Sequence, residues 1–499
     1  MIPAGVCMLI RCAFKAMLCT EYGLFFTEEP DYEKGEMLMK LVYDINDKPP
    51  IKKNLLYAFQ QLLAIMAATL LVPVLVNSGN EGKLPYLDQS AALLGAGMGT
   101  LFYILVTLRK SPVFLGSSFA FIAPLCGACA FGYLGIVLGA VFAGAVYLII
   151  ALIIKFTGSK WVNKLLPPVV IGPTVALIGL SLCGSAVTNL MNTNGGMQDY
   201  SLIHIALGIF AFGMTVWASV KGSKGLKMIP FIVGILSAYV VGLILTLIGN
   251  ATDCAALQII NLSAFDNMKI FQVPHFTFLG LFGVGNDAGQ VANGITGIGD
   301  VISVFMLFAP VAFVTLAEHI ADHKNLSSII NRDLITEPGL HRTLVGDGAG
   351  SIIGSIFGGC PNTTYGESVG CVAITGNASV STIVIAAIYC IILAFFGPFA
   401  AFVNSIPSCI TGGVCIALYG FIAVSGLKML QPVDLGDNRN LFVVAAILVC
   451  GIGGLTLKFG NVENPVIEIS AIATALILGI LVNVIFNRRK GEEKNADQQ

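Results

Sequence analysis

Apolar runs of about 20 residues recur along almost the whole chain, separated by short charged or turn-rich breaks. A helix needs about 20 residues to cross the hydrocarbon core of a bilayer, so each run is long enough to span it. Only 11% of the 499 residues are charged, whereas soluble domains carry about 25%. The sequence therefore predicts an all-α polytopic membrane protein embedded in a lipid bilayer.

The runs divide the chain into fourteen candidate spans, arranged as two groups of seven. The first group is expected at residues 55–77, 90–108, 112–131, 133–154, 166–187, 201–219 and 228–249. The second group is expected at 301–321, 344–358, 361–377, 379–403, 407–426, 440–456 and 466–487. The ninth run is short and interrupted by glycine, which makes it the poorest candidate of the set.

Lysine and arginine gather in alternate connections between these runs. Cytoplasmic loops of membrane proteins are enriched in these residues, so the alternation predicts the side on which each loop lies. With a cytoplasmic N-terminus, the loop cations fall on the cytoplasmic side, except Lys83, Lys269 and Lys458. Both termini are therefore expected in the cytoplasm, with the chain crossing the cell membrane many times.

The two groups of seven echo one another. The fifth span opens on a Pro-Pro pair followed by Gly172, and the twelfth opens on Pro407 followed by Gly412. Matching features lie about 240–250 residues apart, in step with the charge pattern, which favours a true repeat over chance recurrence of Pro and Gly. An odd number of spans per repeat inverts the second copy, as is common in secondary transporters.

The third and tenth spans both contain segments that are poor helices. Residues 116–119 read Gly-Ser-Ser-Phe, and residues 358–366 contain Pro361 followed by Asn-Thr-Thr. Proline, the residue before it and β-branched threonines all disfavour a helix start here. Non-helical backbone at membrane depth must line a cavity or find a partner. We expect two short extended stretches that can pair, each followed by a helix whose N-terminal N–H groups face the cavity.

Glu318 in the eighth predicted span and Glu367 in the tenth are acidic residues among apolar or small neighbours. An ionisable group at mid-bilayer costs about 2.5–3.5 kcal/mol on insertion scales, so such groups mark functional sites by default. Burial and mutual repulsion favour a shared proton between them. A protonated carboxyl both donates and accepts hydrogen bonds, which suits a planar ligand with alternating N–H and C=O groups.

Three further polar residues follow Glu318. Asp322 lies at i+4 on the same helical face, and His319 and His323 are adjacent to these acids. They are either part of the proton-coupling machinery or an interfacial cap near the cytoplasmic loop.

The remaining features exclude several classes of function. A net charge of −1 presents no basic surface for nucleic acid. No nucleophile–base or metal-ligand constellation is evident, so neither an enzyme nor a cofactor is expected. Cys126 and Cys129 form a lone CxxC without a second pair, which is typical of small apolar packing residues.

The expected organisation has five parts. Residues 1–50 form a cytoplasmic segment, of which the first 36 are interpreted as an over-extended start or a disordered tail. Residues 51–250 and 301–487 form the two seven-span repeats, residues 251–300 an extracellular loop region, and residues 488–499 a cytoplasmic tail.

Several motifs together resemble the nucleobase–ascorbate transporter family, in its uracil permease branch. Pro-Asn-Thr-Thr-Tyr-Gly-Glu-Ser-Val-Gly-Cys-Val-Ala-Ile-Thr-Gly (361–376) is similar to the family signature. Gly-Ser-Ser-Phe-Ala-Phe (116–121), Ala-Glu-His-Ile (317–320) and Leu-Tyr-Gly-Phe-Ile-Ala-Val-Ser-Gly-Leu (418–427) support the likeness. It covers about residues 50–490.

The resemblance implies a proton-coupled symporter of uracil or a related nucleobase that works as a homodimer. Spans 1–4 and 8–11 would form a core domain, and spans 5–7 and 12–14 a gate domain. Substrate-binding roles are implied for Glu318, Glu367, Phe119, Gly366, Tyr365, Ser118 and Tyr419. Proton-coupling roles are implied for Glu318, Asp322 and His323.

Three positions depart from the family pattern. Ser368 stands where Asn is usual, Gln61 where His is usual, and Asp322 where uracil permeases often carry His. A carboxylate titrates differently from an imidazole, so both proton coupling and substrate preference can differ. The alternatives are a xanthine or purine permease of the same family, a related-fold anion transporter, and a channel.

Overall fold

The computed structural model describes residues 41–79, 85–191, 201–266, 268–282, 294–460 and 465–496. The interpretation of the first 36 residues therefore lies outside the described residues, as do residues 283–293 of the predicted loop region. Residues 41–50 run along the junction between α15 (Gly366–Thr375) and α16 (Val380–Ala394), where Tyr43 pairs with Asn377 in a parallel bridge. This stretch is therefore docked against the second repeat.

The first half of the chain is a succession of helices with one short strand. It contains α2 (Ile51–Gly79), α3 (Gln89–Val106), β1 (Leu115–Ser117), η1 (Phe119–Phe121), α4 (Ile122–Ala128), η2 (Cys129–Phe131), α5 (Gly132–Thr157), α6 (Lys160–Leu165), α7 (Pro168–Ser181), α8 (Cys183–Met191), α9 (Leu202–Lys221), α10 (Lys224–Met228) and α11 (Pro230–Thr252).

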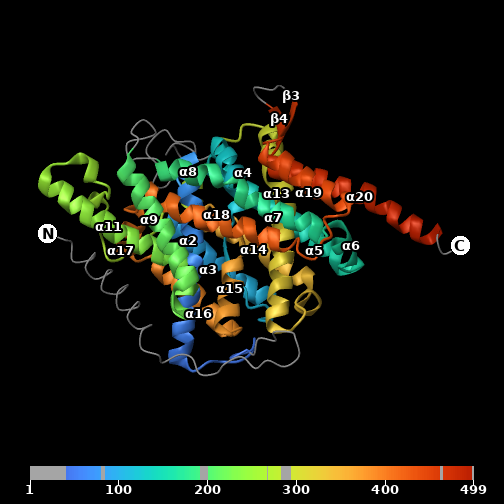
Figure 1. The fold of residues 1–499 in the computed structure, drawn as a ribbon, viewed down its shortest axis with the longest axis horizontal. Helices are drawn as coiled ribbons and strands as arrows, with labels where there is room; N and C mark the ends of the chain where they lie inside the picture. Colours follow the sequence, from blue (N-terminus) through green and yellow to red (C-terminus); the bar gives the residue numbers. More distant parts are fainter. Residues whose placement is uncertain are drawn as a thin grey trace.

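The connection and the second half follow the same plan (Figure 1). The connection contains η3 (Ala255–Leu257), η4 (Leu262–Phe265) and α12 (Thr277–Leu281). The second half contains α13 (Ile298–Ile330), η5 (Ile335–Gly339), α14 (Leu340–Gly358), β2 (Asn362–Thr364), α15 (Gly366–Thr375), α16 (Val380–Ala394), α17 (Gly397–Asn404), α18 (Ser408–Lys428), α19 (Asn438–Ile452), β3 (Leu457–Gly460), β4 (Pro465–Ile469) and α20 (Ala471–Ala496).

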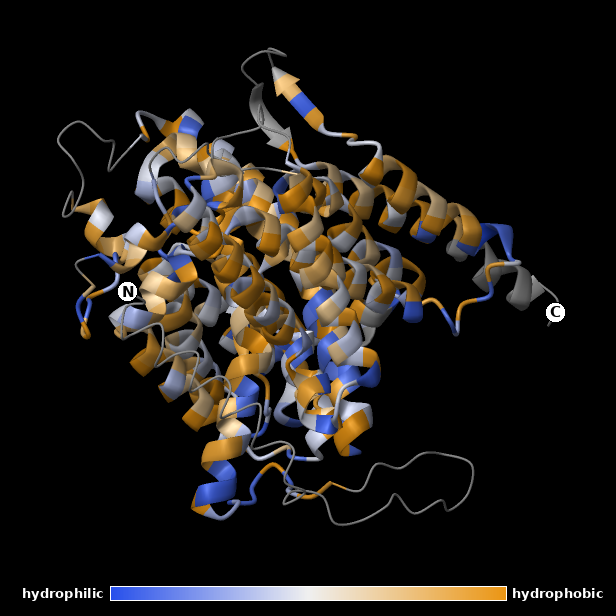
Figure 2. Ribbon diagram, turned by 60° about the vertical axis from the view of Figure 1, so that its left-hand side comes forward, coloured by the Kyte–Doolittle hydropathy of each residue, from blue (hydrophilic) through white to orange (hydrophobic). Residues whose placement is uncertain are grey.

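Each predicted span contains at least one helix, and the third and tenth spans also contain the strands β1 and β2. Within the described residues, eight helical stretches are long and apolar enough to cross a membrane, and three shorter apolar helices accompany them. Figure 2 shows apolar residues covering most of the outer helices, as expected for surfaces that face lipid. The number of crossings, fourteen, stays a prediction.

Three predicted spans differ from the helices in the structure, one in where it begins and two in being divided. The fourteenth span is predicted to begin at residue 466, but residues 465–469 form β4, which pairs with β3 in an antiparallel hairpin. The alternation of Val, Ile and Glu suits a strand better than a helix. The fifth and eleventh spans are each divided, into α7 and α8 and into α16 and α17.

Helix contacts between the two halves have counterparts in which the roles of the halves are swapped. Counting α2, α3 and α5 as equivalent to α13, α14 and α16, the contact of α3 with α16 matches that of α14 with α5. The contact of α2 with α16 likewise matches that of α13 with α5. The α3–α14 and α7–α18 contacts each join a helix to its own counterpart. This is the packing of two inverted repeats.

The α3–α14 contact depends on small residues. A Cβ atom added to Gly95 would lie 2.7 Å from the carbonyl oxygen of Gly354, and one added to Gly99 would lie 2.9 Å from that of Gly350. Small residues at four-residue spacing let membrane helices approach until their backbones touch. These two helices therefore form a rigid support behind the two strands.

The two predicted extended stretches are present and pair with each other. β1 and β2 run antiparallel, with Gly116 opposite Thr363. Outer backbone groups are satisfied by the flanking helices: the Leu115 N–H donates to Thr100 Oγ1 of α3 over 3.0 Å, and Ser351 Oγ of α14 donates to the Asn362 carbonyl. Each strand is thus also hydrogen-bonded on its outer edge to a neighbouring helix, which suits backbone in an apolar surrounding.

Candidate substrate site

The structure brings together the two carboxylates that the sequence singled out. Glu318 lies in the interior of α13, and Glu367 lies in the first turn of α15. Their carboxyl groups are within electrostatic range of each other. Both residues are partly accessible, whereas the adjacent Ala317 and Ser368 are fully buried. The acids therefore stand on the open side of their helices, beside the strand pair.

Asp322 joins this pair as a third carboxylate. Its Oδ2 accepts a 2.8 Å hydrogen bond from Thr364 Oγ1, and its Oδ1 lies 3.6 Å from the position of a Cβ atom on Gly366. It thus sits at the N-terminus of α15, where the helix dipole favours negative charge. Because α13 continues to Ile330, Asp322 lies inside the helix and not at its end.

Phe119 connects the strand pair to α18. Its ring packs edge-to-face on Tyr419 of α18, with ring centroids 5.7 Å apart. Ser118 precedes it, and the Ser118 N–H donates to the Pro361 carbonyl over 3.0 Å. This N–H is therefore occupied by the strand pair, whereas the Ser118 hydroxyl is buried without a hydrogen-bond partner among the described residues.

Tyr365 is built into the frame of the site. Its hydroxyl donates to the Ser117 carbonyl over 2.7 Å, and its N–H donates to the Phe114 carbonyl over 3.1 Å. Its ring covers Gly116, where an added Cβ atom would lie 2.4 Å from ring carbons. The side chain is 4% exposed, so its hydroxyl is committed to holding β1 in place.

Two of the three departures from the family pattern contact each other. Gln61 Nε2 of α2 donates to Ser368 Oγ, and the Phe114 N–H donates to the same oxygen over 3.1 Å. One hydroxyl thus joins α2, the segment before β1 and the helix that carries Glu367. All three residues are buried, so the two exchanged side chains act as one packing unit.

Sequence reasoning missed a fourth carboxylate, Asp347 of α14, which is fully buried. Its Oδ2 lies 2.7 Å from Nδ1 of His319, and both side chains are completely buried. Its other oxygen, Oδ1, has no hydrogen-bond partner among the described residues. The available signal was an acid between two glycines within the ninth run, the poorest of the candidate membrane helices.

The two histidines stack face to face, with ring centroids 4.0 Å apart. His323 Nδ1 donates to the His319 carbonyl over 2.8 Å, and its Nε2 lies 2.8 Å from the Tyr103 hydroxyl of α3. Tyr103 also bonds Ser111, beyond the end of α3. His323 therefore bonds α3 and the loop after it, while Asp322 bonds the strand pair.

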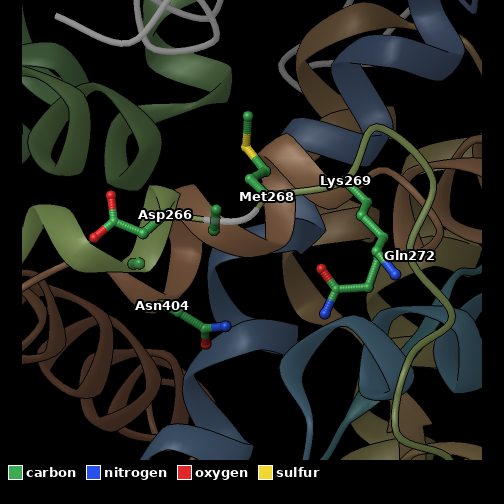
Figure 3. A pocket seen from close by; sticks show the side chains of 7 residues that line it. Asp266, Met268, Lys269, Gln272 and Asn404 are labelled. Atoms are coloured by element: carbon green, nitrogen blue, oxygen red, sulfur yellow. The ribbon is translucent and has the colours of Figure 1, made fainter. Parts of the chain in front are cut away.

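A polar pocket away from the carboxylates lies on the surface around η4 and α17 (Figure 3). The side chains labelled there, including Asp266, Lys269 and Asn404, point in different directions. The pocket shares no residue with the carboxylate cluster. The site formed by α13, α15 and the strand pair is therefore the better candidate for binding a small polar ligand.

Comparison with known proteins agrees with this architecture. Residues 52–459 match the model of a permease family. The chain belongs to the nucleobase–ascorbate transporter family of permeases. It is 40% identical to the uracil permease of Bacillus caldolyticus over 463 residues, covering 92% of this chain and 98% of that protein. It is 35% identical to the uracil permease of Bacillus subtilis, with the same two coverages.

The fold is shared with more distant transporters. The structure of murine Slc26a9, an anion transporter in the inward-facing state, superimposes with a TM-score of 0.58 at 11% identity, covering 95% of this chain and 75% of that one. This likeness concerns the fold alone, and it agrees with the inverted-repeat architecture derived from the helix packing.

Proposed function

We propose that this permease imports uracil together with protons by alternating access. The observation that carries the proposal is the convergence of Glu318 and Glu367 beside the β1–β2 pair. The uracil permeases that are 35% and 40% identical to the chain support uracil as the substrate.

The chemistry of the site suits a uracil ring. Uracil presents N–H and C=O groups alternately around its edge. An ionised carboxylate accepts from an N–H, whereas a protonated carboxyl also donates to a C=O. Gln60 Oε1 and the Ser118 hydroxyl are buried without hydrogen-bond partners among the described residues, so polar atoms are available for such a ligand. Phe119 offers a ring face for stacking.

Proton coupling follows from the crowding of acids. Glu318, Asp322 and Glu367 lie within electrostatic range of one another, so full ionisation is disfavoured by like-charge repulsion. In this proposal uracil binding favours protonated Glu318, and the loaded site crosses the membrane with its proton. Asp322 and His323 tune that step.

Alternating access requires two groups of helices that move relative to each other. We assign α2–α5 and α13–α17 to a core that holds the substrate, and α7–α11 and α18–α20 to a gate. The Phe119–Tyr419 ring contact lies where the groups meet. The same proposal places the protein in the cell membrane as a homodimer with both termini in the cytoplasm.

Uptake into vesicles tests the function directly. The purified full-length protein in proteoliposomes should accumulate labelled uracil when the outside is acidified, and a protonophore should abolish the accumulation. Uptake that continues unchanged with the protonophore would contradict symport. An uncoupled channel would equilibrate uracil without accumulating it.

Competition defines the substrate class. Unlabelled uracil should displace the label better than xanthine or hypoxanthine. Stronger displacement by either purine would reassign the protein to purine transport. Inhibition by sulfate or bicarbonate, with no displacement by any base, would favour an anion transporter instead.

A further inference from the structure

The buried pair Asp347–His319 stands directly behind the substrate carboxylates. His319 is the residue after Glu318, and the Asp347 carboxyl lies within electrostatic range of both Glu318 and Asp322. Neither Asp347 nor His319 has any exposed side-chain surface. The pair comes from α13 and α14, so it belongs to the same packed group as the site and does not touch the proposed substrate.

Hydrogen-bond counting determines how many protons the pair carries. Thr343 Oγ1 donates its single proton to the Leu340 carbonyl over 3.1 Å, and it also lies 2.9 Å from His319 Nε2. A hydroxyl has one proton to donate, so His319 Nε2 carries a proton and donates it to Thr343. A neutral imidazole with its proton on Nε2 has a bare Nδ1, which must accept.

The atom facing Nδ1 is Asp347 Oδ2, 2.7 Å away. Two bare lone pairs at this distance would repel each other, so a proton lies between them. Asp347 is then either a neutral acid that donates to His319, or an ionised acid beside an imidazolium. In both forms one proton lies between the two side chains, a second stays on His319 Nε2, and the pair has no net charge. The unpartnered Asp347 Oδ1 agrees with the neutral acid, because an ionised oxygen buried without a partner is far more costly.

We propose that Asp347 and His319 form a proton-holding pair that exchanges the coupled proton with the substrate carboxylates. This rests on the proposed proton symport. Within the pair, the Asp347 O–H bond breaks as an N–H bond forms on His319 Nδ1. The Nε2–H bond of His319 then breaks as an O–H bond forms on ionised Glu318, and the proton on Nδ1 stays to bond the ionised Asp347.

Thr343 makes this second state possible. Its hydroxyl turns from the Leu340 carbonyl to donate to the vacated His319 Nε2. Both ring nitrogens of His319 and Asp347 Oδ2 are therefore hydrogen-bonded in two arrangements that differ by one proton. Other titratable groups face it from every side: Tyr147 of α5, whose ring centroid lies 6.3 Å from that of His319, Tyr103 of α3, and on α13 and α15 His323, Asp322, Glu318 and Glu367.

The experiment separates proton coupling from uracil binding. Asp347→Asn and His319→Gln keep hydrogen-bonding groups at both positions but cannot hold the proton. Each purified variant is assayed in proteoliposomes for exchange of labelled uracil at equal pH on both sides, and for accumulation under an imposed pH difference. The matched control is Tyr239→Phe, which removes a buried 2.7 Å hydrogen bond to Ser405 elsewhere in the fold.

For one proton per uracil, an imposed difference of about one pH unit sustains about tenfold accumulation. Both variants should exchange uracil within about threefold of the parent rate yet lose this accumulation. The double variant should be no worse than either single variant, because the two side chains act as a unit. The control should accumulate uracil like the parent.

Two results would overturn the proposal. Accumulation at the parent level in both variants would show that the pair does not exchange the proton. Loss of exchange and accumulation together, in protein that still elutes as a single folded species, would show that the pair only supports the helices. Failure of the parent protein itself to exchange uracil would instead refute the proposed function.

Discussion

The two halves of this permease share a scaffold but differ in their chemistry. α2, α3 and α5 pack on their neighbours as α13, α14 and α16 do, and each half contributes one strand to the β1–β2 pair. Residues 51–79, 89–106 and 115–157 of the first half contain no acid. The equivalent part of the second half carries Glu318, Asp322, Asp347 and Glu367.

In the proposed mechanism, this difference lets an inverted repeat act as a coupled transporter. A scaffold that opens to either side needs symmetry. Here the symmetry comes from the packing of equivalent helices, whose backbones are in contact. Charge does not need to be symmetric, and placing acids in both halves would increase the repulsion among them. The first half therefore contributes neutral donors and acceptors, such as Gln61 and Ser118, to a site whose ionisable groups come from the second.

The largest effect is expected when the acids are removed. Glu318→Ala and Glu367→Ala should each abolish uracil uptake without lowering the amount of folded protein, because a hydrogen bond to a charged group contributes about 1.5–3 kcal/mol and both acids bond uracil in the proposed site. Labelled uptake, normalised to protein in the membrane, is the measurement. Normal transport by either variant would contradict the proposal that the acids of the second half bind uracil.

A smaller effect is expected at the hydroxyl that joins the halves. Ser368→Ala leaves Gln61 Nε2 and the Phe114 N–H buried without a partner, which should cost about 1–3 kcal/mol for each group. The melting temperature should fall and the KM for uracil should rise, and Ser368→Thr should restore both in part. The control is Ser355→Ala, since the Ser355 hydroxyl is buried without a partner among the described residues. An equal fall in melting temperature in Ser368→Ala and in this control would contradict the proposed role of the Ser368 hydroxyl.

The helix contact between the halves gives a test of their symmetry. Gly95→Ala would place a methyl group 2.7 Å from the Gly354 carbonyl oxygen, and overpacking of this kind costs about 1–3 kcal/mol. Gly354→Ala should destabilise the protein similarly, because its Cβ atom would meet the Asn362 side chain. Melting temperature in detergent is the measurement, with Gly184→Ala, which has open space around it, as the control. An unchanged melting temperature in Gly95→Ala would mean that α3 and α14 pack less tightly than the structure shows.

The smallest effect is expected at an exposed ion pair between the halves. Lys110 Nζ lies 2.6 Å from Glu337 Oε1, and hydrogen bonding and the nearby positive charge lower the pKa of Glu337. A lowered carboxyl pKa adds stability above the ordinary value for glutamate, and this stability disappears as pH falls through the lowered value. Glu337→Gln should remove that small pH dependence from thermal unfolding while leaving uracil uptake unchanged. A clear loss of uptake would extend the functional region to the surface.

The sequence alone determined the class of the protein and much of its internal order. Runs of about 20 apolar residues can form only membrane helices, and Pro361 with its threonines could not begin a helix, so the broken spans and the inverted repeat were predictable. The motif around Glu367 identified the family. Acids at mid-membrane depth are too costly to be incidental, so their position within apolar runs was enough to single out Glu318 and Glu367.

Only the tertiary structure decided which groups meet. The Ser368–Gln61 contact joins residues 307 positions apart, and the Asp347–His319 pair depends on how closely α14 approaches α13. Neither contact follows from hydrophobic periodicity, because periodicity reports which face of a helix is buried and not which side chain lies opposite. The strand hairpin before α20 was missed for a similar reason, since its backbone pairing partner lies outside the apolar run.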